Sequence, residues 1–114
     1  MIHNKTKGFT IIANQKIARN ILRKGLGLMF RSRPDYCLIF PFKNSKKVAL
    51  TMWFVFFPVD VLFLDEHKKV VDIKKDFRPF THYTPKNKAS FILEFPAGVL
   101  GQTGLGDEIE INGL

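Results

Sequence analysis

The longest apolar stretch of the chain, residues 48–64, places the strongest constraint on how it can fold. Its seventeen residues are fewer than the roughly 20 that a transmembrane helix needs. Pro58 and Asp60 lie in its second half, where a membrane helix would bring an unpaired carboxylate into hydrocarbon. Because proline interrupts a hydrogen-bonded ladder, we predict two buried strands separated at Pro58 and no transmembrane segment.

The composition indicates a folded domain built on strands. Twelve phenylalanines are present, and aromatic and β-branched residues dominate residues 54–63 and 91–95. A chain of 114 residues suits one domain, 1–114, in which residues 1–7 form a flexible or edge segment. Patterning then assigns a set of residues to the core: Met29, Phe40, Met52, Phe54, Phe56, Val61, Phe63, Ile92 and Leu93.

A helix is predicted after a first strand at residues 8–13. Asn14 can cap it, Gly25 can end it, and its apolar residues recur at helical spacing. Four basic residues occupy its other side: Lys16, Arg19, Arg23 and Lys24. The predicted helix is therefore amphipathic and basic.

The remaining pattern predicts strands joined by turns. Residues 35–42 and 90–95 read as buried strands, and residues 108–111 alternate as a last strand. Residues 59–73 read as a hairpin with a charged turn at 66–69. Residues 74–88 are polar and contain two prolines, so we expect irregular structure and a mobile loop there.

Charge is distributed unevenly along the chain. Residues 1–47 carry a net charge of +10 and residues 48–114 a net charge of −2. A basic surface would favour an acidic partner, such as nucleic acid, anionic lipid or an acidic protein, although a solvated face is the simpler interpretation. Cys37, the single cysteine, excludes an internal disulfide and is interpreted as an inert core thiol. With no signal-like N-terminal run, a cytoplasmic location is expected.

Four short motifs occur in a fixed order. They are a glycine pair before Leu-Met-Phe-Arg at residues 25–31, the Pro58-Val59-Asp60 strand, Leu93-Glu94 before Ala97-Gly98, and Gly106-Asp107. In this order they resemble the domain-of-unknown-function family number 192, also called uncharacterised protein family 0127. The resemblance implies a small, mainly β (α+β) domain with a barrel-like or strongly curved sheet and one or two short helices. It implies no established reaction.

The chain departs from that family at one place. Many members carry Trp-Met-Lys-Asn-Thr before the Pro-hydrophobic-Asp motif, whereas this chain has Thr51-Met52-Trp53-Phe54-Val55. An apolar wall thus replaces the polar Lys-Asn-Thr, and a site built on those polar residues is not expected.

Asp60 is the leading site candidate, because a carboxylate among apolar neighbours must find donors or take up a proton. It can face a pocket, with Arg31 as charge partner and Trp53 as an apolar wall, or accept hydrogen bonds from backbone amides near residues 25–29. The second, structural interpretation is favoured. We expect it to be largely buried in either case.

No cofactor, metal site or catalytic residue is predicted. The three histidines lie far apart without ligand spacing, and Cys37 has no histidine partner in a recognisable motif. The glycine pairs at 25–27 and 104–106 lack the further residues of nucleotide loops. Arg31 and Arg33 could bind an anion, but such loops are more often solvated.

Three classes of function follow. The first is a non-catalytic ligand-binding or accessory module with a groove near residues 25–33 and Asp60. The second is a nucleic-acid-binding β domain that uses Arg19, Arg23, Lys24 and Arg33. The third, ranked last, is a small hydrolase or lyase using Asp60 with His82.

Overall fold

The computed structural model describes residues 1–17, 35–46, 50–51, 57–78 and 81–114. All regular elements in these ranges are strands, so the described part of the chain is mainly β, as predicted. The first five strands are β1 (Ile2–Asn4), β2 (Phe9–Ile12), β3 (Asn14–Ile17), β4 (Tyr36–Lys46) and β5 (Leu50–Thr51). The other five are β6 (Val59–Leu64), β7 (Val70–Phe77), β8 (His82–Tyr83), β9 (Ala89–Pro96) and β10 (Ile109–Ile111).

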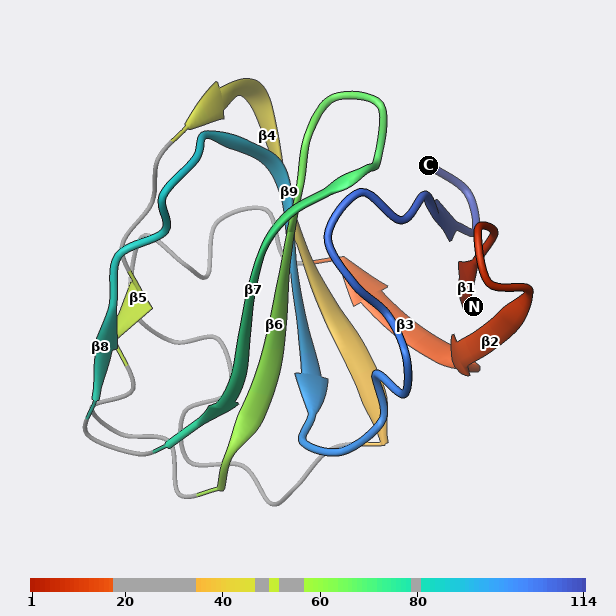
Figure 1. Ribbon diagram of the computed structural model, residues 1–114, viewed down its shortest axis with the longest axis horizontal. Coiled ribbons are helices and arrows are strands. Elements are labelled where there is room, and N and C mark those ends of the chain that lie inside the picture. Colours follow the sequence, from red (N-terminus) through yellow and green to blue (C-terminus); the bar gives the residue numbers. More distant parts are fainter. Residues whose placement is uncertain (18–34, 47–49, 52–56, 79–80) are drawn as a thin grey trace.

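The described strands form three sheets (Figure 1). The large sheet has the order β3-β4-β9-β6-β7, the small sheet has the order β10-β1-β2, and β5 pairs with β8. Within the large sheet only β3 and β4 run parallel, whereas β4, β9, β6 and β7 are antiparallel neighbours. The described strands do not close into the barrel that the family resemblance allowed.

The large sheet has apolar side chains on both faces. Every residue of β6 is buried, which explains why residues 59–64 read as a continuous apolar run rather than an alternating one. One face packs against the small sheet, in a cluster that joins Leu62, Leu93 and Phe95 to Ile2 and Ile109. The other face carries a second cluster, which we call the far face: Leu38, Phe40, Phe57, Val59, Val61, Phe63, Phe77, Ala89 and Ile92.

The hairpin and the strand core are confirmed. β6 and β7 pair across a turn in which Asp65 Oδ1 accepts the N–H groups of His67 and Lys69. Of the predicted core residues that the structure describes, all are buried: Phe40, Val61, Phe63, Ile92 and Leu93. The others, Met29, Met52, Phe54 and Phe56, lie outside the described residues.

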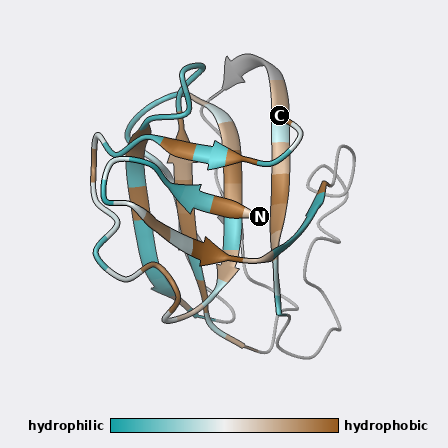
Figure 2. Ribbon diagram, turned by 90° about the vertical axis from the view of Figure 1, so that its right-hand side faces the viewer, coloured by the Kyte–Doolittle hydropathy of each residue, from teal (hydrophilic) through white to brown (hydrophobic). Residues whose placement is uncertain are grey.

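The N-terminal segment differs from the prediction in two places. Ile2–Asn4 is the middle strand of the small sheet, where a flexible or edge segment was expected over residues 1–7. Buried and accessible positions alternate along β1 and β10. Figure 2 shows hydrophobic and hydrophilic residues interspersed along the described strands. The helix prediction is wrong over Asn14–Ile17, which forms β3, because pairing with β4 outweighs the local helical spacing. Residues 18–25 lie outside the described part.

The prediction of irregular structure over residues 74–88 is wrong in part. β7 continues to Phe77, and His82–Tyr83 forms β8. The buried carboxylate of Asp72 anchors this segment, since it accepts the Tyr83 hydroxyl and the Lys86 N–H, both at 2.8 Å. A polar sequence with prolines is thus tied down by one acid on the preceding strand.

Candidate functional site

Asp60 lies on β6 and is 4% exposed. Its Oδ1 accepts the backbone N–H of Asp76 at 2.8 Å, and its Oδ2 accepts that of Gly98 at 2.9 Å. The prediction of a buried carboxylate bound by backbone amides is confirmed, but the amides come from β7 and from the turn after β9. Residues 25–29 and Arg31 lie outside the described part.

The bond from Asp76 explains why an acid is needed at position 60. Val59 pairs with Phe77 and Val61 with Lys74, so two residues of β7 lie opposite Asp60 in a β-bulge. Asp76, the second of them, has a φ of 52°, which a side-chain-bearing residue adopts only at some cost. Asp60 therefore holds a strained bulge in place. This geometry supports a structural role.

Of the other predicted site residues, His82 is the one that falls within the described ranges. His82 lies on β8, which pairs with β5, whereas Asp60 lies in the large sheet. The ligand-binding candidates Arg31 and Trp53 lie outside the described residues. The same holds for the anion candidates Arg19, Arg23, Lys24 and Arg33.

Glu94, a residue that the sequence analysis treated only as part of a motif, occupies the centre of the large sheet. It lies on β9, the middle strand, and pairs with Leu38 on one side and Val61 on the other. Paired residues share a face, so Glu94 belongs to the far face. It is 7% exposed, and burial raises the pKa of its carboxyl group from about 4.5 to about 7. The sequence signal that could have identified Glu94 is the presence of an acid within the apolar strand at residues 89–96.

The row of paired residues through Glu94 ends in a lysine on each edge strand. Lys16 pairs with Leu38, and Lys74 pairs with Val61. The Lys16 ammonium lies 4.4 Å from the centre of the Tyr36 ring, and the Lys74 ammonium lies 5.7 Å from that of Tyr83. Both cations thus contact aromatic faces rather than the central carboxyl group.

An open depression of about 550 Å³ lies where β3 and β4 begin. These strands are parallel, so their first residues, Asn14 and Tyr36, are paired and bring two segments distant in sequence to one place. In the sequence, its lining residues stand before and after residues 18–34, which lie outside the described part. Its lining is mostly polar around one aromatic ring: Ala13, Asn14, Gln15, Lys16, Asp35 and Tyr36.

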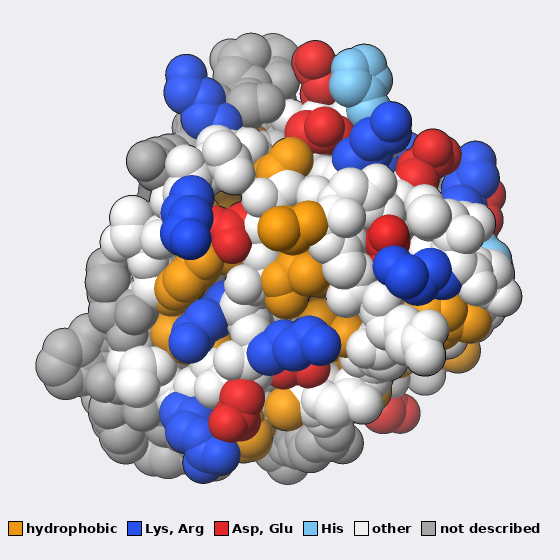
Figure 3. All heavy atoms as spheres, viewed as in Figure 1, with side chains coloured by type: hydrophobic (Ala, Val, Ile, Leu, Met, Phe, Trp, Pro, Cys, Tyr) orange, Lys and Arg blue, Asp and Glu red, His pale blue; other side chains and the backbone are white. Residues whose placement is uncertain are grey.

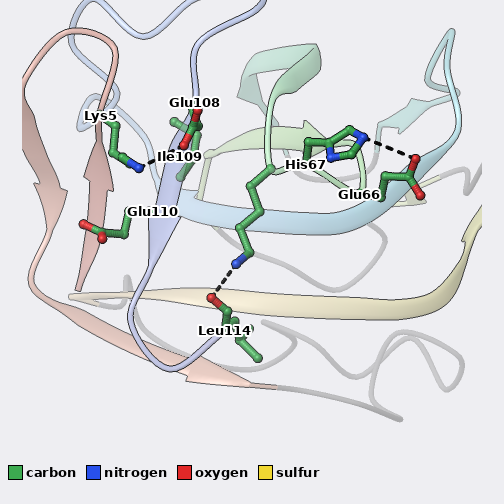
Figure 4. Close-up of a pocket in the computed structure, with 8 residues that line it drawn as sticks. Lys5, Glu66, His67, Glu108, Ile109, Glu110 and Leu114 are labelled. Atoms are coloured by element: carbon green, nitrogen blue, oxygen red, sulfur yellow. Dashed lines mark hydrogen bonds and ion pairs between the residues drawn. The ribbon is translucent and has the colours of Figure 1, made fainter.

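A second depression, of about 320 Å³, lies between β10 and the β6–β7 turn (Figure 4). Its charged groups are largely paired with one another. Lys5 forms an ion pair with Glu108 at 3.0 Å, Glu66 lies 3.5 Å from His67, and the Lys68 ammonium donates to the carbonyl oxygen of Leu114. Few groups remain there for a ligand.

A buried polar cluster connects β1 to the turn before β10. Asp107, 5% exposed, accepts hydrogen bonds from the Asn4 amide, the Lys7 ammonium and the Gly104 N–H. Burial raises the pKa of this carboxyl group, but the bonds from Lys7, Asn4 and Gly104 outweigh burial and hold it below its ordinary value. The late Gly-Asp motif therefore has a structural role, because its aspartate connects β1 and the segment after it to the turn before β10.

These contacts change the meaning of the charge asymmetry. Lys5 and Lys7 belong to the basic first part of the chain, yet both pair with acids near the C-terminus, Glu108 and Asp107. The face in Figure 3 shows basic and acidic side chains interspersed. The surplus of basic residues in the first part of the sequence is thus partly neutralised by acids that lie beside them in the fold.

Cys37 is fully buried, and burial raises the pKa of its thiol well above the ordinary value. The predicted position of this thiol in the core is confirmed. Within the described ranges no group of three metal-ligating side chains comes together. No helix there is long and apolar enough to cross a membrane.

Comparison with known families shows which family the chain belongs to. The uncharacterized ACR family, domain of unknown function 192, matches residues 2–111. The chain belongs to this family of uncharacterised proteins. A UPF0127 protein of Thermococcus sibiricus is 37% identical over 96% of this chain and 73% of its own length. Another, from Pyrococcus furiosus, is 36% identical over 96% of both chains.

Solved structures share the fold. A candidate transcription regulator from Sinorhizobium meliloti 1021 superposes with a TM-score of 0.76 at 24% identity, covering 88% of this chain and 82% of that one. A protein of unknown function from Novosphingobium aromaticivorans also gives a TM-score of 0.76, at 22% identity over 85% of this chain and 74% of that one. At these identities the likeness concerns the fold alone.

Proposed function

We propose that this chain is a non-catalytic ligand-binding or accessory module, and that the ligand occupies the depression where β3 and β4 begin. The observation that carries the proposal is the lining of that depression, which places Lys16, Asp35 and the Tyr36 ring around about 550 Å³ of open space. A few polar groups around an aromatic surface are typical of small-molecule sites.

The groove expected from the sequence near residues 25–33 falls outside the described residues, and the proposed site lies at residues 13–16 and 35–36 instead. Asp60 drops out of the site, since both of its oxygens already bind backbone amides. The same bonds weaken the hydrolase alternative, whose acid would have been Asp60. The buried free thiol of Cys37 supports a reducing compartment, so we propose a cytoplasmic location.

A thermal-shift screen of the full chain against metabolites, lipid headgroups and short oligonucleotides tests the proposal. We expect a small molecule that raises the melting temperature and loses this effect in the Lys16→Gln variant. Lys86→Gln, which changes an exposed lysine outside the depression, is the matched control and should retain the effect.

Two outcomes contradict the proposal. The first is a small-molecule effect that Lys16→Gln leaves unchanged. The second is stabilisation by single-stranded oligonucleotides alone, falling log-linearly with salt, which would favour the nucleic-acid alternative.

A further inference from the structure

Asn112 and Gly113 form the turn that follows β10, and they are the only Asn-Gly pair in the chain. Both residues are exposed, and Gly113 has a φ of 84°. Within the described structure one backbone hydrogen bond closes the turn, from the Leu114 N–H to the Ile111 carbonyl oxygen at 3.0 Å. The pair is therefore open to water and held by a single bond.

The segment on each side of the pair is held more firmly. Ile111 is buried in β10, and the Leu114 carbonyl oxygen accepts the Lys68 ammonium (Figure 4). Between them, the Asn112 side-chain amide and the Gly113 N–H bond to no other group in the described part of the chain. Glycine has no Cβ, so nothing shields its amide nitrogen from the preceding side chain.

The other asparagines whose side chains the structure describes lack this combination. Asn4 is buried, and the Asn87 amide donates to a backbone carbonyl oxygen at 3.0 Å. Asn14 is exposed, but like the other two it precedes a residue with a bulky side chain. Asn112 is thus the described asparagine whose surroundings leave its side chain free to react with the backbone.

We propose that Asn112 is a modification site, at which the chain deamidates spontaneously through a cyclic imide. The Gly113 nitrogen loses its proton and attacks the side-chain carbonyl carbon of Asn112. A new C–N bond forms, and the side-chain nitrogen leaves as ammonia. Water then opens the ring at one of its two carbonyl groups, which gives aspartate or isoaspartate. Asparagine is among the thermolabile residues of proteins, and here rotation of its backbone costs one turn bond.

The modification reaches a residue of β3. The backbone carbonyl oxygen of Asn112 accepts the side-chain amide of Gln15 at 2.7 Å, and Gln15 lines the depression where β3 and β4 begin. In isoaspartate this carbonyl group becomes a carboxylate, so the same bond gains a charged acceptor. The backbone also becomes one atom longer within the turn, which should break the bond that closes it. The inference does not require a ligand in the depression.

Incubation of the folded full chain in heavy-oxygen water at mildly alkaline pH, followed by peptide mass spectrometry, tests the site. We expect Asn112 to convert faster than Asn4, Asn14 and Asn87 together, with heavy oxygen in the product. Conversion should be slower at mildly acidic pH, because the attacking nitrogen must lose its proton. Nitrogen-15 NMR should show the side-chain amide signal of Gln15 shifting as the product accumulates.

Asn112→Gln should stop the conversion, because its longer side chain would have to close a larger ring. Asn87→Gln, which changes an exposed asparagine elsewhere, is the matched control and should leave conversion at Asn112 unchanged. A parallel incubation in urea removes the influence of the turn. Conversion in urea without conversion in the folded chain would show that the turn protects Asn112, and it overturns the proposal. Folded-state conversion no faster than at the other three asparagines overturns it as well.

Discussion

Asp107 and Glu94 are both more than nine-tenths buried, yet their surroundings shift their pKa values in opposite directions. Asp107 accepts bonds from an ammonium, a side-chain amide and a backbone amide, and its pKa is lowered. Glu94 accepts none from the described residues, and its pKa is raised to about 7. Burial alone therefore does not determine the charge of an acid. The donors within reach determine it.

The difference follows from where each acid lies along the backbone. Glu94 is in the middle of a strand paired on both sides, so the amides around it are used in the two ladders. Asp107 lies in a turn, and Asp60 lies opposite a bulge, where the ladder is interrupted and amides are free to bond side chains. Acids at breaks in the sheet thus find backbone donors, whereas the acid within the sheet accepts no hydrogen bond from the backbone of its neighbouring strands.

Replacing Asp107 should have the largest effect on stability. Asp107→Ala leaves the Lys7 ammonium, the Asn4 amide and the Gly104 N–H without their shared acceptor, and should lower the free energy of unfolding by about 3 to 4 kcal/mol. Urea denaturation at pH 7 measures the change. Glu110→Gln removes an exposed acid and should behave like the parent. An Asp107→Ala variant as stable as the parent would remove the basis of the comparison.

Removing the charge of Glu94 should change the pH dependence of stability. Because its pKa is raised in the folded state, the folded protein binds more protons than the unfolded chain between about pH 4.5 and pH 7. The parent should therefore lose stability as pH rises through this window, by about 3 kcal/mol in total from this group. Glu94→Gln should abolish that loss.

The two acids act in separate pH windows, which provides the control. The lowered pKa of Asp107 means that its contribution is present above its ordinary value near 3.8 and is lost at lower pH. Urea titrations of the parent and Glu94→Gln from pH 4.5 to pH 8 should then diverge only through Glu94. Parallel curves would show that Glu94 is ionised in the folded protein across the whole range.

Sequence reasoning predicted the features that depend on local pattern. The apolar run with Pro58 predicted β6 and the buried Asp60, and the charged turn predicted the β6–β7 hairpin, while most of the strand expected before Pro58 lies outside the described residues. It failed where pairing between distant segments decides the outcome. Asn14–Ile17 joins β4, and Ile2–Asn4 lies between β2 and β10, although neither segment carries a strong strand pattern.

The roles of the candidate site residues could be only partly predicted from the sequence, for the same reason. Glu94 in residues 89–96 is an acid among apolar residues, just as Asp60 is. Which of the two would find donors depends on the bulge at Asp76 and the turn at Gly98. Both are set by strand register, which a single sequence does not reveal.

Asp60 should show the smallest of the three effects, since its two donors are neutral amides and it binds no described cation. Asp60→Ala should lower the free energy of unfolding by roughly 1 to 3 kcal/mol, because two amides lose their acceptor and Asp76 stays in its strained conformation. Asp60→Asn keeps one acceptor oxygen and should lose less. Hydrogen exchange should locate the change, with faster exchange at the amides of Asp76 and Gly98 than in the parent. If both amides keep their protection, another group holds the bulge, and Asp60 regains its place as a candidate for binding a ligand.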